Sequence, residues 1–151
     1  MKVTAKADYA VRAMTVLAAA GGALVKADVI AERQDIPRHF LDNILTDLRR
    51  AGLVATQRGA DGGSRLARPA TDITMADVMR AMEGPLAAVR DVRPEQLSYD
   101  APASSLPEVW IAVRAALRGV LEHVTLADVV AGRLPKAVTR LAADPEAWKV
   151  H

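Results

Sequence analysis

The stretch Arg38–Pro69, RHFLDNILTDLRRAGLVATQRGADGGSRLARP, carries the strongest structural signal in this 151-residue chain. Its first half has the period of an amphipathic helix, because apolar residues collect on one side at about 100° per residue and Gly52 ends the pattern. That apolar side consists of Phe40, Leu41, Ile44, Leu45 and Leu48. The opposite side is polar and carries Arg38, His39, Asp42, Asn43, Thr46 and Arg50.

The second half of the stretch predicts a β-hairpin. LVATQR after Gly52 and SRLA before Pro69 have the composition of short strands, and GADGG between them supplies residues that tolerate the positive φ angles of a tight turn. Three arginines surround the turn: Arg58, Arg65 and Arg68. Because a hairpin turn does not itself need arginine, we interpret this loop as a basic surface that approaches a polyanion.

Two shorter helices are expected before this stretch. Thr4 is placed to cap the first, whose apolar residues recur at helical spacing until Gly21 and Gly22. The second covers Asp28–Gln34, and Pro37 suits the first turn of the helix that follows. The order helix, helix, turn, helix, strand, turn, strand is that of a winged helix-turn-helix, in which the polar side of the third helix enters a major groove of DNA and the hairpin forms the wing.

Two short capped helices are expected in the C-terminal half. The pattern Thr74-x-x-Asp77 starts a helix that ends at Gly84, and Thr125-x-x-Asp128 starts one that ends at Gly132. The segment 85–104 between the first of these and the next helix contains three prolines and has no clean periodicity, so a loop is expected there.

A long helix is expected between these two capped helices. The pattern Ser105-x-x-Glu108 predicts a capping box at its start. Its apolar face is continuous and larger than a small domain needs to cover, so we expect the helix to pair with its copy in a homodimer. The predicted dimerisation residues are Val109, Trp110, Val113, Leu117, Val120, Leu121 and Val124.

The predicted fold is mainly α with a small β-hairpin. We expect a winged helix-turn-helix DNA-binding domain over residues 1–84 and a variable loop over residues 85–104. A dimerisation helix and a short following helix are expected over residues 105–132, and a C-terminal tail over residues 133–151. Beyond Leu134 the tail is weakly patterned and is expected to fray.

Composition excludes several classes of function. There is no cysteine, which excludes disulfides, thiol nucleophiles and cysteine-ligated zinc or iron–sulfur sites. His39, His123 and His151 are scattered, and no nucleotide-binding glycine pattern occurs, so we expect neither an enzyme nor a metal site. No apolar run approaches the ~18 residues of a membrane span, and Asp8 and Arg12 interrupt the one segment that resembles a signal peptide. A cytoplasmic protein without membrane contact is expected.

The net charge of +2 is unevenly distributed. Residues up to Arg68 include eleven basic and seven acidic side chains, which gives +4 and leaves −2 for the remainder. The N-terminal part is therefore the part expected to meet an anion, which favours a sequence-specific regulator that binds double-stranded DNA. The alternative is a winged-helix module that serves only protein–protein assembly, but such a module has no need of arginines beside the turn.

Several segments are similar to one bacterial family. KADYAVRAMTVLA, IAERQDIPRHFLDNILTDLRRAGLVATQRGADGGSRLARP and ITMADVMRAMEGPL resemble the Rrf-two-type transcriptional regulators, the group of IscR, NsrR and CymR. EVWIAVRAALRGVLEHVTLADV is similar to that family's dimerisation helix and its short successor. The resemblance extends to about Gly132, and RRAGLV with RGADGGSRLARP is its most specific part.

The resemblance implies a homodimeric winged-helix transcription factor, with repression as the expected activity, on a near-palindromic operator. Arginine suits guanine edges and narrow minor grooves, asparagine can pair with adenine, and glycine lets backbone amides approach phosphate. Carried over by position, the DNA-binding residues are Arg38, His39 and Asn43 on the recognition helix and Arg58, Gly59, Gly62, Gly63 and Arg65 on the wing.

The chain departs from the family pattern in one respect. Many members hold an iron–sulfur cluster through cysteines in the segment after the wing helix, and the corresponding segment here, AAVRDVRPEQLSYDAPASS, has none. Asp8, at the position of an acid that helps some members, lacks thiolate partners. We therefore expect a cysteine-free member without a cluster or other cofactor. A small-molecule effector, if there is one, is expected near the variable loop, with Tyr99 and Trp110 as aromatic contacts.

Overall fold

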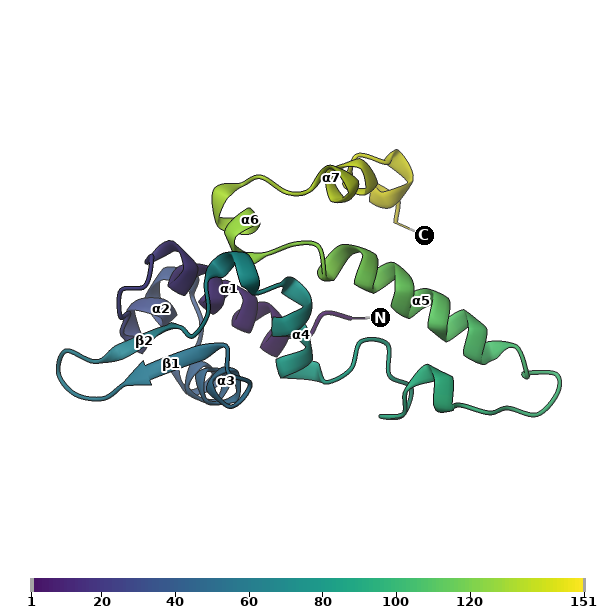
Figure 1. The fold of residues 1–151 in the computed structure, drawn as a ribbon, viewed down its shortest axis with the longest axis horizontal. Coiled ribbons are helices and arrows are strands. Elements are labelled where there is room, and N and C mark those ends of the chain that lie inside the picture. Colours follow the sequence, from purple (N-terminus) through teal and green to yellow (C-terminus); the bar gives the residue numbers. More distant parts are fainter. Residues whose placement is uncertain (1, 151) are drawn as a thin grey trace.

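The computed structural model describes residues 2–150, and Figure 1 shows their path. The elements are α1 (Ala5–Ala19), α2 (Ala27–Gln34), α3 (Arg38–Arg50), β1 (Val54–Gln57), β2 (Gly63–Leu66), η1 (Ala70–Asp72), α4 (Met75–Glu83), η2 (Pro94–Gln96), α5 (Leu106–Leu121), α6 (Leu126–Ala131), α7 (Lys136–Ala142) and η3 (Pro145–Trp148). The predicted fold class is confirmed: three helices lead into a two-stranded antiparallel hairpin, and α4 completes the body.

Helix α1 is the centre of this body. The Thr4 hydroxyl accepts a hydrogen bond from the backbone N–H of Ala7 at 3.1 Å, so the predicted cap is confirmed. The helix contacts α2, α3, α4, α6 and β2. Its buried residues are Ala7, Ala10, Ala13, Met14, Val16 and Leu17. Half of them are alanines, which lets neighbouring elements come close to its backbone.

The turn between α2 and α3 fixes the direction of the third helix. Asp35 ends α2 in the left-handed conformation, with φ at 50°, and the chain then reverses. Ile36, which follows it, is only 4% exposed and anchors the turn in the core. Pro37 has an extended ψ of 128° and is the residue before α3, whereas the sequence placed it in the first turn. Its fixed φ and missing N–H suit either position.

One residue outside the two strands of the hairpin also pairs with it. Its register runs from Val54 opposite Leu66 to Gln57 opposite Gly63. Val25, in the segment that leads into α2, exchanges two backbone hydrogen bonds with Ser64, each of 2.9 Å. The base of the hairpin is therefore held on the helix-turn-helix. A single residue has no period, which explains why Val25 was not predicted.

Two predicted capping boxes are confirmed and lie side by side. Thr74 with Asp77 caps α4, and Thr125 with Asp128 caps α6. The caps themselves pair as a β-bridge between Thr74 and Thr125. The Met75 N–H donates to the Val124 carbonyl at 2.8 Å, so the chain returns to the body after α5.

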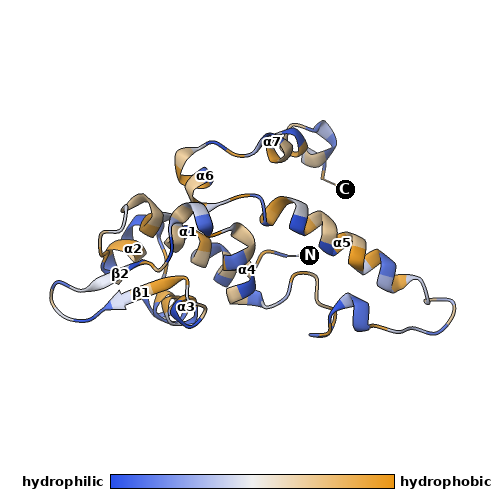
Figure 2. Ribbon diagram, viewed as in Figure 1, coloured by the Kyte–Doolittle hydropathy of each residue, from blue (hydrophilic) through white to orange (hydrophobic). Residues whose placement is uncertain are grey.

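Helix α5 projects from the body beside the 85–104 loop, as Figure 1 shows. It contacts α4 and η2, and none of its sixteen residues is buried. Figure 2 shows hydrophobic residues distributed along its whole length. No helix within residues 2–150 is long and apolar enough to cross a lipid bilayer.

One prediction about the C-terminal half is wrong. The Ser105 side chain makes no capping hydrogen bond, because its backbone is already helical at φ −88° and ψ −5°. The Ncap position needs an extended backbone to aim its hydroxyl at the first free N–H groups. The tail is also more regular than expected, since α7 and η3 follow α6 and the Trp148 indole donates to the Ala142 carbonyl at 2.6 Å.

Candidate nucleic-acid interface

Helix α3 has one side in the core and the other in solvent. Leu41, Ile44 and Leu48 are at most 1% exposed, so they set the rotation of the helix about its axis. The polar side that the sequence predicted to be free is exposed at its N-terminal half and at its end. The exposed residues are Arg38, His39, Phe40, Asp42, Asn43, Arg49 and Arg50. The three predicted recognition residues are thus all accessible.

Phe40 does not lie where the apolar pattern placed it, because its side chain is 50% exposed. It lies next to the buried Leu41 in the first turn of α3, but about 100° away around the helix axis, at the edge of the side that faces the core. Its ring lies 4.4 Å from that of His39 and 6.3 Å from that of Tyr9 on α1, measured between centroids. The Arg12 guanidinium lies over the Tyr9 ring, with its central carbon 4.9 Å from the ring centroid. These contacts give His39 an aromatic support on the exposed side of α3.

Arg38 is held by two carboxylates. Its Nε lies 2.8 Å from Asp28 on α2, and its Nη1 pairs with Asp42 one turn further along α3. The hydrogen bonds from Asp42 and then Asp28 raise the pKa of Arg38. The guanidinium therefore stays charged but is partly neutralised in the free protein. Its Nε and Nη1 are engaged by carboxylates, so a bidentate contact to a base or a phosphate through these atoms has to compete with Asp28 or Asp42.

The hairpin loop forms the wing, and its arginines point into solvent. Arg58 and Arg65 are both exposed, on opposite sides of the turn. Gly59 has a φ of 108°, which L side chains rarely adopt, so this position favours glycine.

Gly62 and Gly63 are required by close approach of backbone. A Cβ at Gly62 would lie 2.2 Å from the Gln57 carbonyl oxygen across the turn. A Cβ at Gly63 would lie 2.7 Å from the carbonyl oxygen of Val25. The two glycines predicted as DNA-binding residues therefore first of all shape the wing and attach it to the body. Through this they place Arg58 and Arg65.

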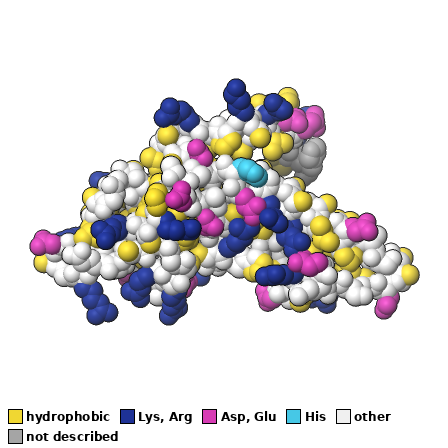
Figure 3. Space-filling view, in the orientation of Figure 1, with side chains coloured by type: hydrophobic (Ala, Val, Ile, Leu, Met, Phe, Trp, Pro, Cys, Tyr) yellow, Lys and Arg dark blue, Asp and Glu magenta, His cyan; other side chains and the backbone are white. Residues whose placement is uncertain are grey.

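Helix α3 and the wing line one groove, with a volume of about 240 Å³. Arg38, Thr46 and Arg49 border it from the helix, and Thr56 and Ser64 border it from the sheet. In Figure 3 lysine and arginine side chains project from the edge of the molecule that α3 and the wing occupy. Among the recognition-helix and wing residues predicted from the sequence, Arg38 and Gly63 line this groove, whereas His39, Asn43, Arg58, Gly59, Gly62 and Arg65 do not.

Arg49 was missed by the sequence analysis. It lies six residues beyond Asn43 on α3 and borders the groove together with Arg38. The helical period assigned its neighbour Arg50 to the polar side and left Arg49 unassigned. Arg50 itself lies 3.5 Å from Asp47, and Asp47 also pairs with Lys6 of α1 at 2.9 Å. Arg49 has no ion pair with any residue from 2 to 150, so it is the freer of the two.

The predicted dimerisation residues form a separate apolar surface on α5. Val109 is 48% exposed, and Trp110, Val113, Leu117, Val120 and Leu121 are partly exposed. Val124 differs from them, because it lies beyond the end of α5 and is only 5% exposed within its own chain. It contributes to the body and leaves little surface for a partner.

The donor atoms of the chain do not fit an iron–sulfur cluster, which needs thiolate or imidazole ligands. The sequence has no cysteine, and residues 2–150 contain no group of three or more His, Asp or Glu side chains that could hold a metal ion. Asp8 is engaged elsewhere, since its carboxylate lies 2.9 Å from Arg12.

The geometry suits a duplex. Exposed arginines on a helix with a free polar face can pair with guanine edges and phosphates, and a projecting basic loop can follow the neighbouring minor groove. Asn43, exposed in the middle of α3, can pair with adenine.

Comparison with known proteins gives the same picture. The family model Rrf2, described as an iron-dependent transcriptional regulator, matches residues 3–132. A protein of Mycobacterium tuberculosis (strain ATCC 25618 / H37Rv) classed as a helix-turn-helix-type transcriptional regulator is 53% identical over 145 residues, 95% of this chain and 90% of that protein. The solved structure of CymR, the global cysteine regulator of B. subtilis, superposes with a TM-score of 0.72 at 34% identity, over 87% of this chain and 98% of that one. The structure of T. potens IscR gives a TM-score of 0.67 at 34% identity and covers 100% of this chain and 93% of the other.

Proposed function

The chain belongs to the Rrf2 family of transcriptional regulators and is a DNA-binding regulator, and from this premise we propose that it acts as a homodimer that represses transcription from a near-palindromic operator without an iron–sulfur cluster. The proposal extends to the cytoplasm as the place of action, since a bacterial regulator works where the chromosome lies.

The groove shared by α3 and the wing is the observation that carries the proposal. It brings Arg38, Arg49 and the base of the wing to one surface, with Asn43 exposed on the same helix. A surface of this kind combines side chains that select bases with side chains that bind phosphate. A module used only for assembly would gain nothing from arginines at these positions.

The homodimer is supported by α5. A helix with an apolar face and no buried residue is unstable in water unless something covers that face. A second copy of the same helix, related by a two-fold axis, offers a self-complementary cover. Two winged helices related in this way would meet two half-sites of opposite orientation, which is the symmetry of a palindrome. A dimer bound there excludes other proteins from the same DNA, so repression needs no further contact.

We infer the absence of a cluster from the side chains that are available as iron ligands. The family model is described as iron-dependent, yet this chain has no cysteine to ligate iron. Protein purified without oxygen should be colourless and should contain neither stoichiometric iron nor acid-labile sulfide. Visible absorption that disappears with iron chelation would overturn this part of the proposal.

The decisive experiment for the DNA-binding proposal is selection of bound fragments from the organism's own genomic DNA at near-physiological salt. We expect recovery of a few fragments that share an inverted repeat, and sedimentation of the complex as two chains per duplex. Arg49→Ala and Asn43→Ala should lose that enrichment, and Arg140→Ala in α7 should retain it as the matched control. Uniform recovery of fragments without a shared motif would contradict a sequence-specific regulator.

A further inference from the structure

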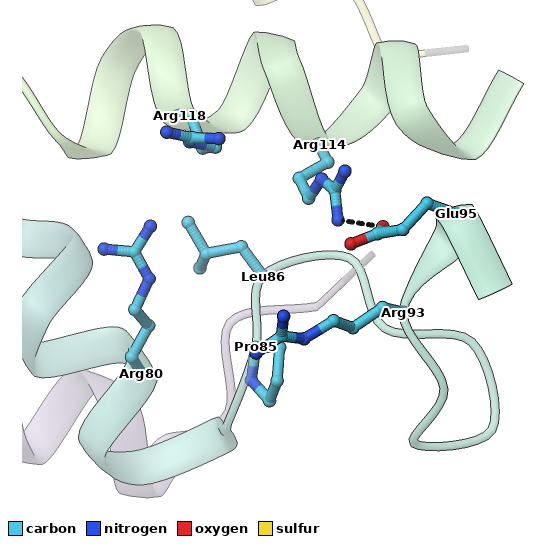
Figure 4. A pocket seen from close by; sticks show the side chains of 7 residues that line it. All are labelled: Arg80, Pro85, Leu86, Arg93, Glu95, Arg114 and Arg118. Atoms are coloured by element: carbon cyan, nitrogen blue, oxygen red, sulfur yellow. Dashed lines mark hydrogen bonds and ion pairs between the residues drawn. The ribbon is translucent and has the colours of Figure 1, made fainter. Parts of the chain in front are cut away.

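A second concave site lies between α4 and α5, with a volume of about 340 Å³ (Figure 4). It shares no residue with the groove between α3 and the wing. Four arginines line it: Arg80 from α4, Arg93 from the loop, and Arg114 and Arg118 from α5. Pro85 and Leu86 form its apolar part, and Leu86 is only 9% exposed. Guanidinium groups from three separate segments thus converge on one cavity.

The carboxylates near the cavity neutralise only part of this charge. Arg114 pairs with Glu95 at 2.5 Å, shown by the dashed line in Figure 4. Arg80 and Arg118 share one carboxylate, Glu122, with an Nε–Oε1 distance of 3.0 Å for Arg118.

Arg93 has no ion pair with any residue in the described range 2–150. Four arginines and one carboxylate, Glu95, therefore line the cavity, and Glu122, outside the lining, pairs with two of the arginines.

We propose that this cavity binds a small oxyanion with two or more negative charges, such as a phosphate ester or a polycarboxylate. Each guanidinium presents a planar fork of N–H donors that matches a carboxylate or a phosphate. The volume lies at the lower end of the range of about 300–1,000 Å³ for small-molecule sites, so a compact metabolite fits and a polymer does not. Tyr99 and Trp110, the aromatic contacts expected from the sequence, do not line the cavity.

The same arginines connect the DNA-binding body to the proposed dimer helix. Arg80 projects from α4, which packs on α1 and α3, and Glu122 ties it to Arg118 at the end of α5. An anion that takes over Arg80 and Arg118 competes with Glu122 and alters this connection. The position of α5 relative to α3, and hence the spacing of two recognition helices, then depends on the ligand. This regulatory consequence rests on the proposed homodimer, whereas the anion site itself does not.

The test is isothermal titration calorimetry of the full-length protein, without DNA, at near-physiological chloride. Pyrophosphate and citrate serve as probes, which separates phosphate from carboxylate chemistry. We expect saturable binding of at least one probe with one molecule per chain. Arg93→Ala should weaken binding at least tenfold, while Glu122→Gln should tighten it severalfold because it releases Arg80 and Arg118. A damaged fold would weaken binding in both variants, so the opposite signs separate ligand contact from misfolding.

Two control variants test where on the protein the probe binds. Arg58→Ala in the wing should leave probe binding unchanged, which excludes the DNA surface as the place of binding, and Arg133→Ala beyond α6 should also have no effect. The inference is overturned if neither probe binds saturably, or if Arg58→Ala weakens binding as much as Arg93→Ala. Genomic DNA binding, measured in parallel, separates the two proposals: wild-type protein that selects DNA but ignores both probes refutes the anion site alone.

Discussion

Arg38 of α3 and Asp28 of α2 form an ion pair of 2.8 Å that links the recognition helix to the helix before it. Since the Arg38 side chain is 44% exposed and also pairs with Asp42, the free protein presents this arginine in a partly neutralised form. A base or phosphate contact by Arg38 must therefore compete with carboxylates of its own chain.

Replacing Asp28 by Asn should tighten DNA binding. The change frees one side of the Arg38 guanidinium and removes a negative charge near the phosphates. Exposed ion pairs are worth about 0.2–1 kcal/mol, so we expect a gain of up to about fivefold per subunit on specific and random duplexes alike. Fluorescence anisotropy with labelled duplexes measures it. Asp100→Asn, in the 85–104 loop, is the matched control, and weaker binding by Asp28→Asn would show that Asp28 positions Arg38 for DNA.

Arg58→Ala and Asn43→Ala should differ in their dependence on salt. If Arg58 contacts a phosphate, its loss lowers affinity for every sequence and reduces the slope of log K against log salt by about 0.9 per contact. Loss of Asn43 should cost about 1–3 kcal/mol per base contact on the operator, without a change of slope. Salt titrations on operator and scrambled DNA distinguish the two. Equal operator affinity for both variants and the wild type would reduce the wing to an ordinary hairpin turn.

Gly62→Ala should impair DNA binding while the core stays folded. The added Cβ would meet the Gln57 carbonyl oxygen at 2.2 Å, so the turn has to open and the two wing arginines move. Gly119→Ala is the control, because a Cβ there would have no atom within 4 Å apart from its chain neighbours and the backbone of its own helix. In a helix interior that change should stabilise the protein by up to about 1 kcal/mol. Thermal unfolding and anisotropy together report both effects; unchanged affinity for Gly62→Ala would contradict the role given to the wing.

Val113→Asp should dissociate the proposed dimer. The residue lies in the middle of the apolar face of α5, and burying an unpaired carboxylate costs several kcal/mol, on the order of 3–5 when a partner charge is missing. Ala115→Asp introduces the same charge at an exposed position on the other side of the helix. Sedimentation velocity at micromolar concentration should give a monomer for the first variant and a dimer for the second. A monomeric wild-type protein would refute the proposed assembly.

The contribution of Glu122 to stability should depend on pH. Hydrogen bonds from Arg80 and then Arg118 lower the pKa of Glu122 in the folded chain. A depressed pKa means that the stabilisation is complete above the unfolded pKa of about 4.3 and is lost as the pH falls through the folded value. The melting temperatures of wild type and Glu122→Gln should therefore differ at pH 7 and converge in acid. The difference should be small, because solvent screens partly exposed arginines. A gap that widens in acid would contradict the assigned sign.

Features with a local cause could be predicted from the sequence. The capping boxes at Thr74 and Thr125 depend on residues three apart, and α3 on a strong helical period, so each was placed correctly. The same pattern at Ser105 was misleading, because the backbone conformation before a helix is set by the preceding loop and not by the motif.

Features caused by tertiary contact could not be predicted. Val25 joins the sheet only because β2 lies beside it, and Phe40 is exposed although its neighbour Leu41 in the same helical turn is buried. The site between α4 and α5 depends on four arginines that are 13, 21 and 4 positions apart along the chain, a spacing without any regular period. Only the fold shows that they converge.

The lack of buried residues in α5 has a thermodynamic consequence for the whole regulator. Under the proposed pairing, this helix derives its free energy of folding from a second chain, so that dissociation and local unfolding become a single event. The free energy of unfolding then depends on the logarithm of the protein concentration. The midpoint of thermal unfolding therefore rises with protein concentration. In a cell, dilution by growth would lower the fraction of intact dimers before any signal arrives. The rate at which the protein is synthesised would therefore affect the expression of the genes that it controls.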